Sequence, residues 1–166
     1  RSSAASDVYK RQTIFDYWSV DTIRRWRNGG KFDGKMLTED QKHIYSIYQR
    51  ILTLCNKEKA ITEGEFFDLM YANANGWRFN EHKQYTFLRK AGKELLFIIV
   101  NFDHISVDVA INVPSHAFDF LQIPQMDIYP AVDLLTGKTE SISLLPYKAT
   151  EISVEGYSGK ILKIKL

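Results

Sequence analysis

The sequence predicts an α+β chain in which a helical N-terminal part is followed by an antiparallel all-β sandwich. Apolar residues recur at helical spacing up to about Gly64 and alternate at strand spacing from Glu65 onward. Of the 166 residues, 45% are hydrophobic and 13% are aromatic, which is typical of a packed globular chain. A chain of this length holds one domain, or two at most.

The first residues have no apolar signal core and no periodicity. Residues Asp7 to Gln12 resemble the in-frame translation of a transposase adapter used in shotgun sequencing. We therefore expect residues 1–12 to be a non-native, adapter-like segment and begin the fold prediction at Thr13. The start of the chain then carries no information about localisation.

Residues 13–61 have the pattern of helices. A short helix is expected to start at Ser19 as N-cap and to end at Asn28, which two glycines follow. A longer helix is expected after Thr38, because Gln41 completes a capping box with it. Its apolar stripe has the spacing i, i+3, i+4, i+7, i+8 and i+11 and consists of Ile44, Ile47, Tyr48, Ile51, Leu52 and Cys55.

That stripe needs a surface to cover it, and little else in the N-terminal part could do so. We therefore expect its support to lie outside the chain. The charged residues Lys57, Glu58 and Lys59 at the end of the helix are predicted to be an ordinary exposed terminus.

Residues 62–166 have the pattern of short strands. The predicted strands are Phe66–Tyr71, Tyr85–Lys90, Leu95–Val100, Ile105–Val113, Ile128–Leu134, Ile142–Leu145, Glu151–Val154 and Leu162–Leu166. Continuous apolar sequence predicts that Leu95–Val100 is a central strand covered on both faces. Gly92 and Gly137 lie between strand pairs and predict hairpin turns. Seven or eight such strands without a long helix indicate an antiparallel sandwich.

Composition excludes several classes of protein. The 22 basic and 20 acidic side chains give a net charge of +2, too close to balance for a dedicated nucleic-acid binder. The apolar run Leu95–Val100 is far shorter than the ~20 residues of a membrane-spanning helix. Cys55 is the single cysteine, which excludes a disulfide framework and a Cys-rich zinc site.

Asp16, Tyr17 and Trp18 form the candidate substrate-binding cluster. An aromatic ring stacks on the apolar face of a sugar while a carboxylate binds its hydroxyl groups. The alternative is packing of Phe15 and Trp18 beneath a helix start, with Asp16 as a cap. A second candidate platform is Trp77 with Tyr85 and Phe87, for which burial in the core is the alternative.

No catalytic residue is predicted in this chain. Gly-x-Ser-x-Gly, His-Glu-x-x-His and Gly-rich phosphate loops do not occur in the sequence. Glu63, Glu65 and Asp68 lie close in sequence, and a hydrated loop is the alternative to an acid/base pair there. The four histidines are scattered without metal-ligand spacing.

The order of these segments resembles the end of the catalytic barrel and the C-terminal domain of α-amylase-family (family 13) glycoside hydrolases. The resemblance is carried by six segments that cover most of the chain after residue 12. They are Thr13–Val20, Tyr45–Glu58 running into Ala60–Gly64, Tyr85–Gly92, Leu95–Phe102, Leu134–Lys138 and Leu144–Ala149.

The resemblance implies that residues 13–61 are the terminal helices of a (β/α)8 barrel and that residues 62–166 are the C-terminal β sandwich. It also implies a longer parent enzyme that cleaves α-glucans or maltooligosaccharides by a retaining mechanism, with its catalytic carboxylates upstream of this chain. Calcium is implied only for that parent, and no cofactor is expected here. The alternative function is a non-catalytic carbohydrate-binding β sandwich.

Overall fold

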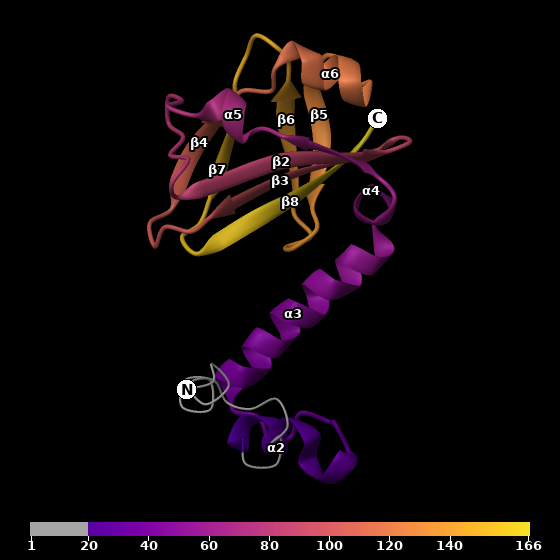
Figure 1. The fold of residues 1–166 in the computed structure, drawn as a ribbon, viewed down its shortest axis with the longest axis vertical. Helices are drawn as coiled ribbons and strands as arrows, with labels where there is room; N and C mark the ends of the chain where they lie inside the picture. The colour runs from indigo at the N-terminus through magenta and orange to yellow at the C-terminus, as the bar shows by residue number, and fades with distance from the viewer. Residues whose placement is uncertain (1–19) are drawn as a thin grey trace, which may run out of the picture. The chain divides into compact units, whose positions relative to one another are not determined.

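A computed structural model describes residues 20–166. Its contacts divide the chain between Gln49 and Arg50 into two compact units, which we call the helical unit and the β unit (Figure 1). The helices are α2 (Asp21–Arg27), the 3-10 helix η1 (Asn28–Gly30), α3 (Glu39–Lys57), α4 (Lys59–Thr62), α5 (Met70–Asn73) and α6 (Ser115–Leu121). The strands are β1 (Glu65–Asp68), β2 (Gln84–Ala91), β3 (Glu94–Asn101), β4 (Val107–Ile111), β5 (Met126–Asp133), β6 (Thr139–Leu144), β7 (Thr150–Val154) and β8 (Ser158–Lys165).

The ends of α2 and the start of α3 were predicted from local sequence signals, and one of these predictions is wrong. The predicted capping box is present: the Thr38 N–H donates to Gln41 Oε1 at 3.0 Å, and the Gln41 N–H donates to Thr38 Oγ1 at 3.3 Å. Helix α2 ends as predicted at Asn28, whose φ of 42° is left-handed. Its N-cap is Val20, so the prediction of Ser19 as N-cap was wrong by one residue.

The strands form a six-stranded sheet in the order β1-β2-β3-β8-β5-β6 and a two-stranded sheet of β4 and β7. All their pairings are antiparallel. The β2–β3 and β5–β6 hairpins turn at Gly92 (φ 56°) and Gly137 (φ 77°), as predicted. The fold class predicted from the sequence, helices followed by antiparallel sheets, is confirmed.

Two segments differ from the predicted strands. The strand predicted over Phe66–Tyr71 ends at Asp68, whose carboxylate accepts the Met70 N–H at 3.0 Å and starts helix α5. Helix α6, which follows Pro114, was not predicted. Its buried residues face the core, so tertiary packing favours a helix that has little local signal.

The main core lies between the two sheets. It joins Leu88, Phe97 and Leu162 of the large sheet to Ile111 and Ile152 of the small sheet, with α6 closing one side. The opposite face of the large sheet carries Leu96 and Ile98 beneath α4. We call this second surface the outer face. Strand β3 is therefore covered on both sides, as its continuous apolar sequence predicted.

The helical unit has little core. Leu37 is the only buried residue among residues 20–49, and no residue of α3 is buried. No helix within residues 20–166 has the length and hydropathy needed to cross a membrane.

Candidate functional site

The structure describes only some of the residues that were predicted from the sequence to bind sugar. Asp16, Tyr17 and Trp18 lie outside the described residues. Tyr85 and Phe87 lie on β2 and both face outward, because they pair with Val100 and Ile98 of the outer face. Trp77 lies in the loop between α5 and β2, and it is 70% exposed rather than part of the core.

Three aromatic rings form a row on the outer face, which we call the aromatic row. Phe66 of β1 lies 5.3 Å from Phe87, and Phe87 lies 5.6 Å from Tyr85, measured between ring centroids. The ring planes are inclined by 42° and 50°, so the rings do not form one flat stacking surface. Phe66 and Tyr85 are exposed, which leaves an apolar strip open on the sheet.

Helix α4 is fastened to another part of the outer face by two side chains of the sheet. Arg89 of β2 donates from Nε to the Ala60 carbonyl and from a terminal nitrogen to the Gly64 carbonyl, each at 2.7 Å. The Glu94 carboxylate of β3 accepts the Ala60 N–H at 2.8 Å. Both ends of this short helix are thereby satisfied by the sheet rather than by water.

A three-residue ion cluster, Glu58, Lys163 and Glu94, joins the same helix to the sheet. The Lys163 ammonium donates to the Glu58 carboxylate and lies 2.9 Å from the Glu94 carboxylate. Glu58 is only 4% exposed. The prediction that Lys57–Lys59 is an ordinary exposed terminus was therefore wrong for Glu58, because its partner comes from a strand 105 residues later.

The cluster holds its members in their charged forms. Burial raises the pKa of Glu94, but hydrogen bonds from Lys163 and the Ala60 N–H lower it further, so the net pKa lies below its ordinary value. Burial likewise lowers the pKa of Lys163, yet its hydrogen bonds to Glu58 and Glu94 raise the net pKa above the ordinary value. The arrangement is that of a structural ion cluster.

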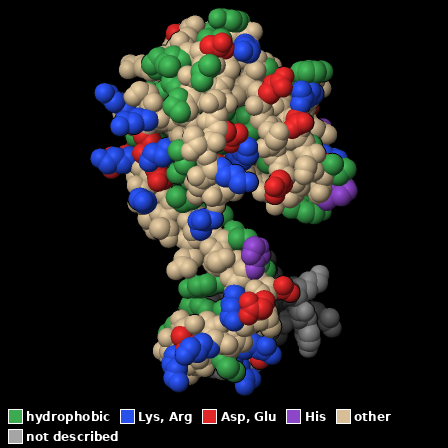
Figure 2. Space-filling view, turned by 180° about the vertical axis from the view of Figure 1, so that it is seen from behind, with side chains coloured by type: hydrophobic (Ala, Val, Ile, Leu, Met, Phe, Trp, Pro, Cys, Tyr) green, Lys and Arg blue, Asp and Glu red, His purple; other side chains and the backbone are tan. Residues whose placement is uncertain are grey.

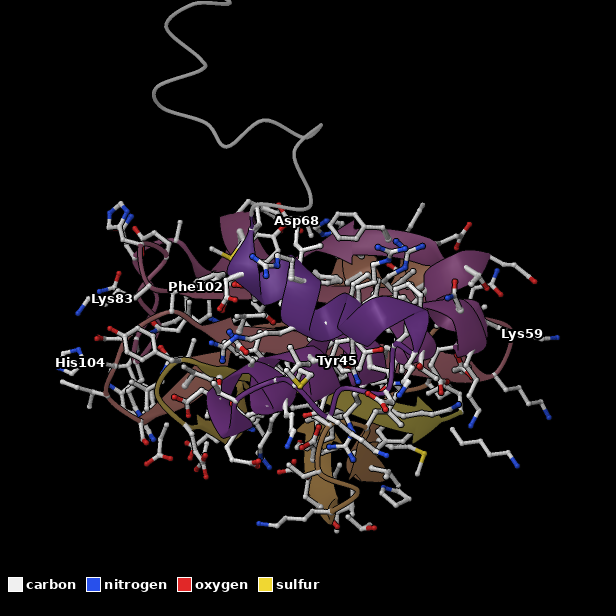
Figure 3. All side chains as sticks on the ribbon, turned by 90° about the horizontal axis from the view of Figure 1, so that it is seen from below. Tyr45, Lys59, Asp68, Lys83, Phe102 and His104 are labelled. Carbon is white, nitrogen blue, oxygen red and sulfur yellow. The ribbon has the colours of Figure 1, made fainter. Side chains whose placement is uncertain are left out.

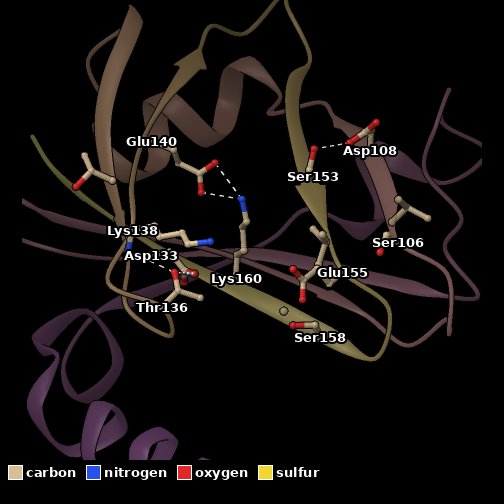
Figure 4. A pocket seen from close by; sticks show the side chains of 14 residues that line it. Ser106, Asp108, Asp133, Thr136, Lys138, Glu140, Ser153, Glu155, Ser158 and Lys160 are labelled. Carbon is tan, nitrogen blue, oxygen red and sulfur yellow. Dashed lines mark hydrogen bonds and ion pairs between the residues drawn. The ribbon is translucent and has the colours of Figure 1, made fainter.

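The β unit also contains a polar pocket of about 430 Å³ near the ends of β4, β5, β7 and β8 (Figure 4). Hydroxyl groups and charges of both signs line it. Lys160 forms an ion pair with Glu140 at 2.9 Å, and Asp108 accepts a hydrogen bond from Ser153. Asp133 is buried and accepts hydrogen bonds from Thr136 and from backbone N–H groups, so it holds the β5–β6 turn.

Three carboxylates of this pocket are engaged by neighbouring donors rather than left free for the acid/base chemistry of glycoside hydrolysis. Retaining hydrolysis needs two carboxyl groups about 5–5.5 Å apart, one to attack the sugar and one to protonate the leaving group. Asp108, Asp133 and Glu140 are each engaged by neighbouring donors. Their positions support turns and strand pairing instead of presenting free groups to a substrate.

The other candidate carboxylates, those of Glu63, Glu65 and Asp68, lie in different environments. Glu63 and Glu65 are exposed. Asp68 uses its carboxylate to begin α5, as described above. Glu63 and Glu65 therefore have the environment of a hydrated junction, while Asp68 is half-buried.

Calcium was implied only for a longer parent. Residues 20–166 contain no group of three or more His, Cys, Asp or Glu side chains that could hold a metal ion.

The visible surface has mixed charge. Figure 2 shows Lys and Arg side chains interspersed with Asp and Glu on the β unit. Several are paired, such as Lys148 with Asp127 at 3.0 Å. A mixed surface does not generate the single-sign field that attracts polyanions.

By sequence, neither a family model nor a curated protein matches the chain. Solved structures do match its fold. A noncanonical maltogenic α-amylase, AmyB from Thermotoga neapolitana, aligns with 78% of this chain at a TM-score of 0.58 and 15% identity. AmyP in complex with maltose aligns with 80% of this chain at a TM-score of 0.54 and 22% identity. The α-amylase of Geobacillus thermoleovorans in complex with acarbose aligns with 78% at a TM-score of 0.54 and 12% identity.

The matched region covers 27%, 23% and 24% of those three proteins, so this chain spans about a quarter of their length. At these identities the likeness concerns the fold. The chain has the fold of a part of the α-amylase structures.

Proposed function

We propose that this chain is the C-terminal portion of an α-glucan-active retaining glycoside hydrolase of the α-amylase type. In this proposal residues 13–61 are the last helices of the catalytic barrel, residues 62–166 are a β domain that stabilises it, and residues 1–12 are not native. The observation that carries the proposal is the fold shared with part of several α-amylases. The substrate of the whole enzyme is then an α-glucan or a maltooligosaccharide.

The chemistry in this proposal is done outside the chain. A retaining mechanism uses one carboxylate as nucleophile and a second carboxyl group as acid and then base. The described carboxylates with short contacts serve turns, helix ends and ion pairs instead. The catalytic carboxylates therefore belong to the barrel strands that precede these helices.

The part of the β unit that supports the barrel is proposed to be the outer face. Its aromatic row is apolar and open, and apolar area of this kind is stabilised when another surface excludes water from it. The exposed stripe of α3, which includes Tyr48 and Leu52, would also be stabilised by a second surface that excludes water from it. We propose that the missing barrel of the same polypeptide covers both.

The upstream coding sequence tests the proposal directly. Amplification from the source DNA across the Gln12–Thr13 junction is expected to reveal a barrel whose strands end in Asp, Glu and Asp. An open reading frame that starts near Thr13, or that continues into unrelated sequence, contradicts the proposal.

The chain itself provides the complementary test. Because the catalytic carboxylates are placed elsewhere, the purified chain is expected to release no reducing sugar from starch. The longer polypeptide recovered from the source DNA serves as the positive control. Measurable hydrolysis by the short chain alone contradicts the assignment of catalysis to the missing barrel.

A second candidate function is a non-catalytic carbohydrate-binding sandwich. The observation that favours it is Trp77, whose large ring is 70% exposed on the β unit. Binding of sugar by the isolated chain would distinguish this function from pure support of a barrel.

A further inference from the structure

Trp77 is an exposed aromatic ring that the surrounding loop holds in place. Asn73, at the start of this loop, is buried, and its side chain donates to the Leu69 carbonyl at 2.8 Å and to the Asn112 carbonyl at 3.0 Å. It also accepts the Asn112 N–H at 2.7 Å. Three hydrogen bonds from one buried amide fix the base of the loop against the strand region that follows β4.

The backbone beside Trp77 is strained. Arg78 has a φ of 58°, a left-handed conformation that costs a residue with a Cβ roughly 1–2 kcal/mol. The conformation is held because the Arg78 carbonyl accepts the Ala110 N–H of β4 at 3.3 Å. Strain of this kind persists where the surrounding contacts over-determine it, and it often accompanies a binding function.

Arg78 also fixes one face of the Trp77 ring. Its guanidinium carbon lies 5.1 Å from the centroid of the ring, within range of a cation–π contact. The guanidinium is itself held by the Asp108 carbonyl at 3.0 Å and by the carboxylates of Asp108 and Glu151 at 3.6 and 3.5 Å. The ring is therefore oriented before any ligand arrives, with its other face open to solvent.

A polar hollow of about 430 Å³ lies beside the same loop. Gly76 and Arg78, the two neighbours of Trp77 in the chain, both line it, and so do Asn80, Lys83 and Asp103. Lys83 and Asp103 form an ion pair at 2.6 Å, which leaves further ammonium donors on Lys83. The side-chain oxygen Oδ1 of Asn80 accepts the His82 N–H at 3.0 Å, which leaves the NH₂ group of the same side chain as a further donor.

A second exposed aromatic residue lies at the same end of the β unit. Phe102, which is 64% exposed, donates its N–H to the Lys83 carbonyl at 2.8 Å. Figure 3 shows Lys83, Phe102 and His104 together at this end, away from Lys59 at the start of α4. The end thus combines an oriented ring, a second apolar ring and polar groups with unused donors.

We infer that Trp77, together with the hollow lined by Arg78, Asn80, Lys83 and Asp103, is a binding site for a pyranose chain. A pyranose has an apolar face that stacks on an aromatic ring and a rim of hydroxyl groups that bind charged and amide side chains. The oriented ring lowers the entropy lost on binding. The choice of an α-glucan as ligand rests on the proposed function, since AmyP was solved with maltose and maltotriose.

Calorimetric titration of the full chain with maltoheptaose tests this site. We expect saturable binding and at least a tenfold loss of affinity in Trp77→Ala, which corresponds to about 1.4 kcal/mol. Tyr147→Ala is the matched control, because Tyr147 is an aromatic residue that is 81% exposed in a different loop, and we expect it to leave the affinity unchanged.

Two outcomes overturn the inference. The first is the absence of saturable binding up to about 10 mM sugar, a range that covers a site with a Kd of ~1 mM. The second is equal affinity of Trp77→Ala and the unchanged chain for the sugar. If Trp77→Ala fails to fold by circular dichroism, Trp77→Phe replaces it, with an expected intermediate affinity and the same overturning outcome. The barrel assignment is tested separately by the upstream sequence, so failure of one does not imply failure of the other.

Discussion

The two units of this chain use apolar residues in opposite ways. In the β unit, Phe97, Ile99 and Leu162 are fully buried between two sheets. In the helical unit, Ile44 and Tyr48 have a comparable apolar pattern but remain more than half exposed. An amphipathic pattern is thus sufficient to form helix α3, while burial depends on a second surface.

This difference indicates which unit contributes most to the free energy of unfolding. Burial of a large apolar side chain contributes about 1.5–3 kcal/mol, and an exposed one contributes little of this. The β unit has the contacts of an independently stable fold, with two packed layers and one contiguous core. The helical unit has only Leu37 buried within residues 20–49, so its stability depends on local helical signals such as the Thr38 capping box.

The largest effect is expected from a cavity in the core of the β unit. Phe97→Ala should lower the free energy of unfolding by about 3–5 kcal/mol, because the ring is fully buried. Ile47→Ala on α3 should change it by no more than about 0.5 kcal/mol, because Ile47 is exposed. Urea denaturation, monitored by near-ultraviolet circular dichroism, measures the free energy of unfolding of both variants.

Similar losses of unfolding free energy in Phe97→Ala and Ile47→Ala would contradict this comparison of the two units, since α3 would then be part of the cooperative core. If Phe97→Ala does not fold, Ile99→Val provides a milder version, with an expected loss of about 0.5–1.5 kcal/mol.

A smaller effect is expected from the ion cluster that joins α4 to the sheet. Lys163→Met leaves the carboxylates of Glu58 and Glu94 facing each other without their cation. Loss of one partner of a fully buried pair costs about 3–5 kcal/mol. Since the Lys163 side chain is 36% exposed, solvent screening reduces the expected cost to about 1–2 kcal/mol.

Lys57→Met is the matched control for this change, because Lys57 is an exposed lysine at the end of α3 and is not a member of the cluster. Thermal unfolding of the two variants should therefore differ. Equal melting temperatures would show that the cluster does not hold α4 in place.

The smallest effect is a pH dependence that belongs to Glu94. Because its pKa is lowered in the folded chain, its stabilising contribution is complete above the ordinary value of 4.5 and is lost as the pH falls through the folded pKa. Glu94→Gln should therefore be less stable than the unchanged chain near neutral pH, and the difference should shrink on acidification. Unfolding free energies measured across this range check the sign.

Lys163 has the opposite dependence. Its raised pKa makes its contribution to stability complete below pH 10.5, with loss only as the pH rises through the folded pKa.

A stability difference between the unchanged chain and Glu94→Gln that grows in acid would contradict the pH dependence expected for Glu94.

Most of the strand pattern was predictable because each strand has a local signal. The alternation in β4 and the continuous apolar run of β3 set which side chains face the core, and Gly92 and Gly137 set the hairpins. Helix α6 had no such signal. Its Phe118 and Leu121 are buried by distant strands, so its existence depends on contacts that the local sequence does not contain.

The candidate sites were less predictable than the fold. The sequence identified Trp77 as an aromatic residue of interest, but its exposure and its contact with Arg78 depend on the path of the loop. Nothing in the sequence near Glu58 indicates a partner on β8. Exposure and pairing are properties of the assembled surface, and residues far apart in the chain create them.

The sequence by itself determined that N-terminal helices precede antiparallel strands, and it determined the capping box at Thr38 and the two glycine turns, because backbone propensity and the periodicity of apolar residues are local. The tertiary structure alone decided that Glu58 is buried against Lys163, that α6 forms, and that Trp77 stands exposed. Each of these depends on whether elements distant in sequence cover a side chain or leave it in water, and a local pattern carries no record of that packing.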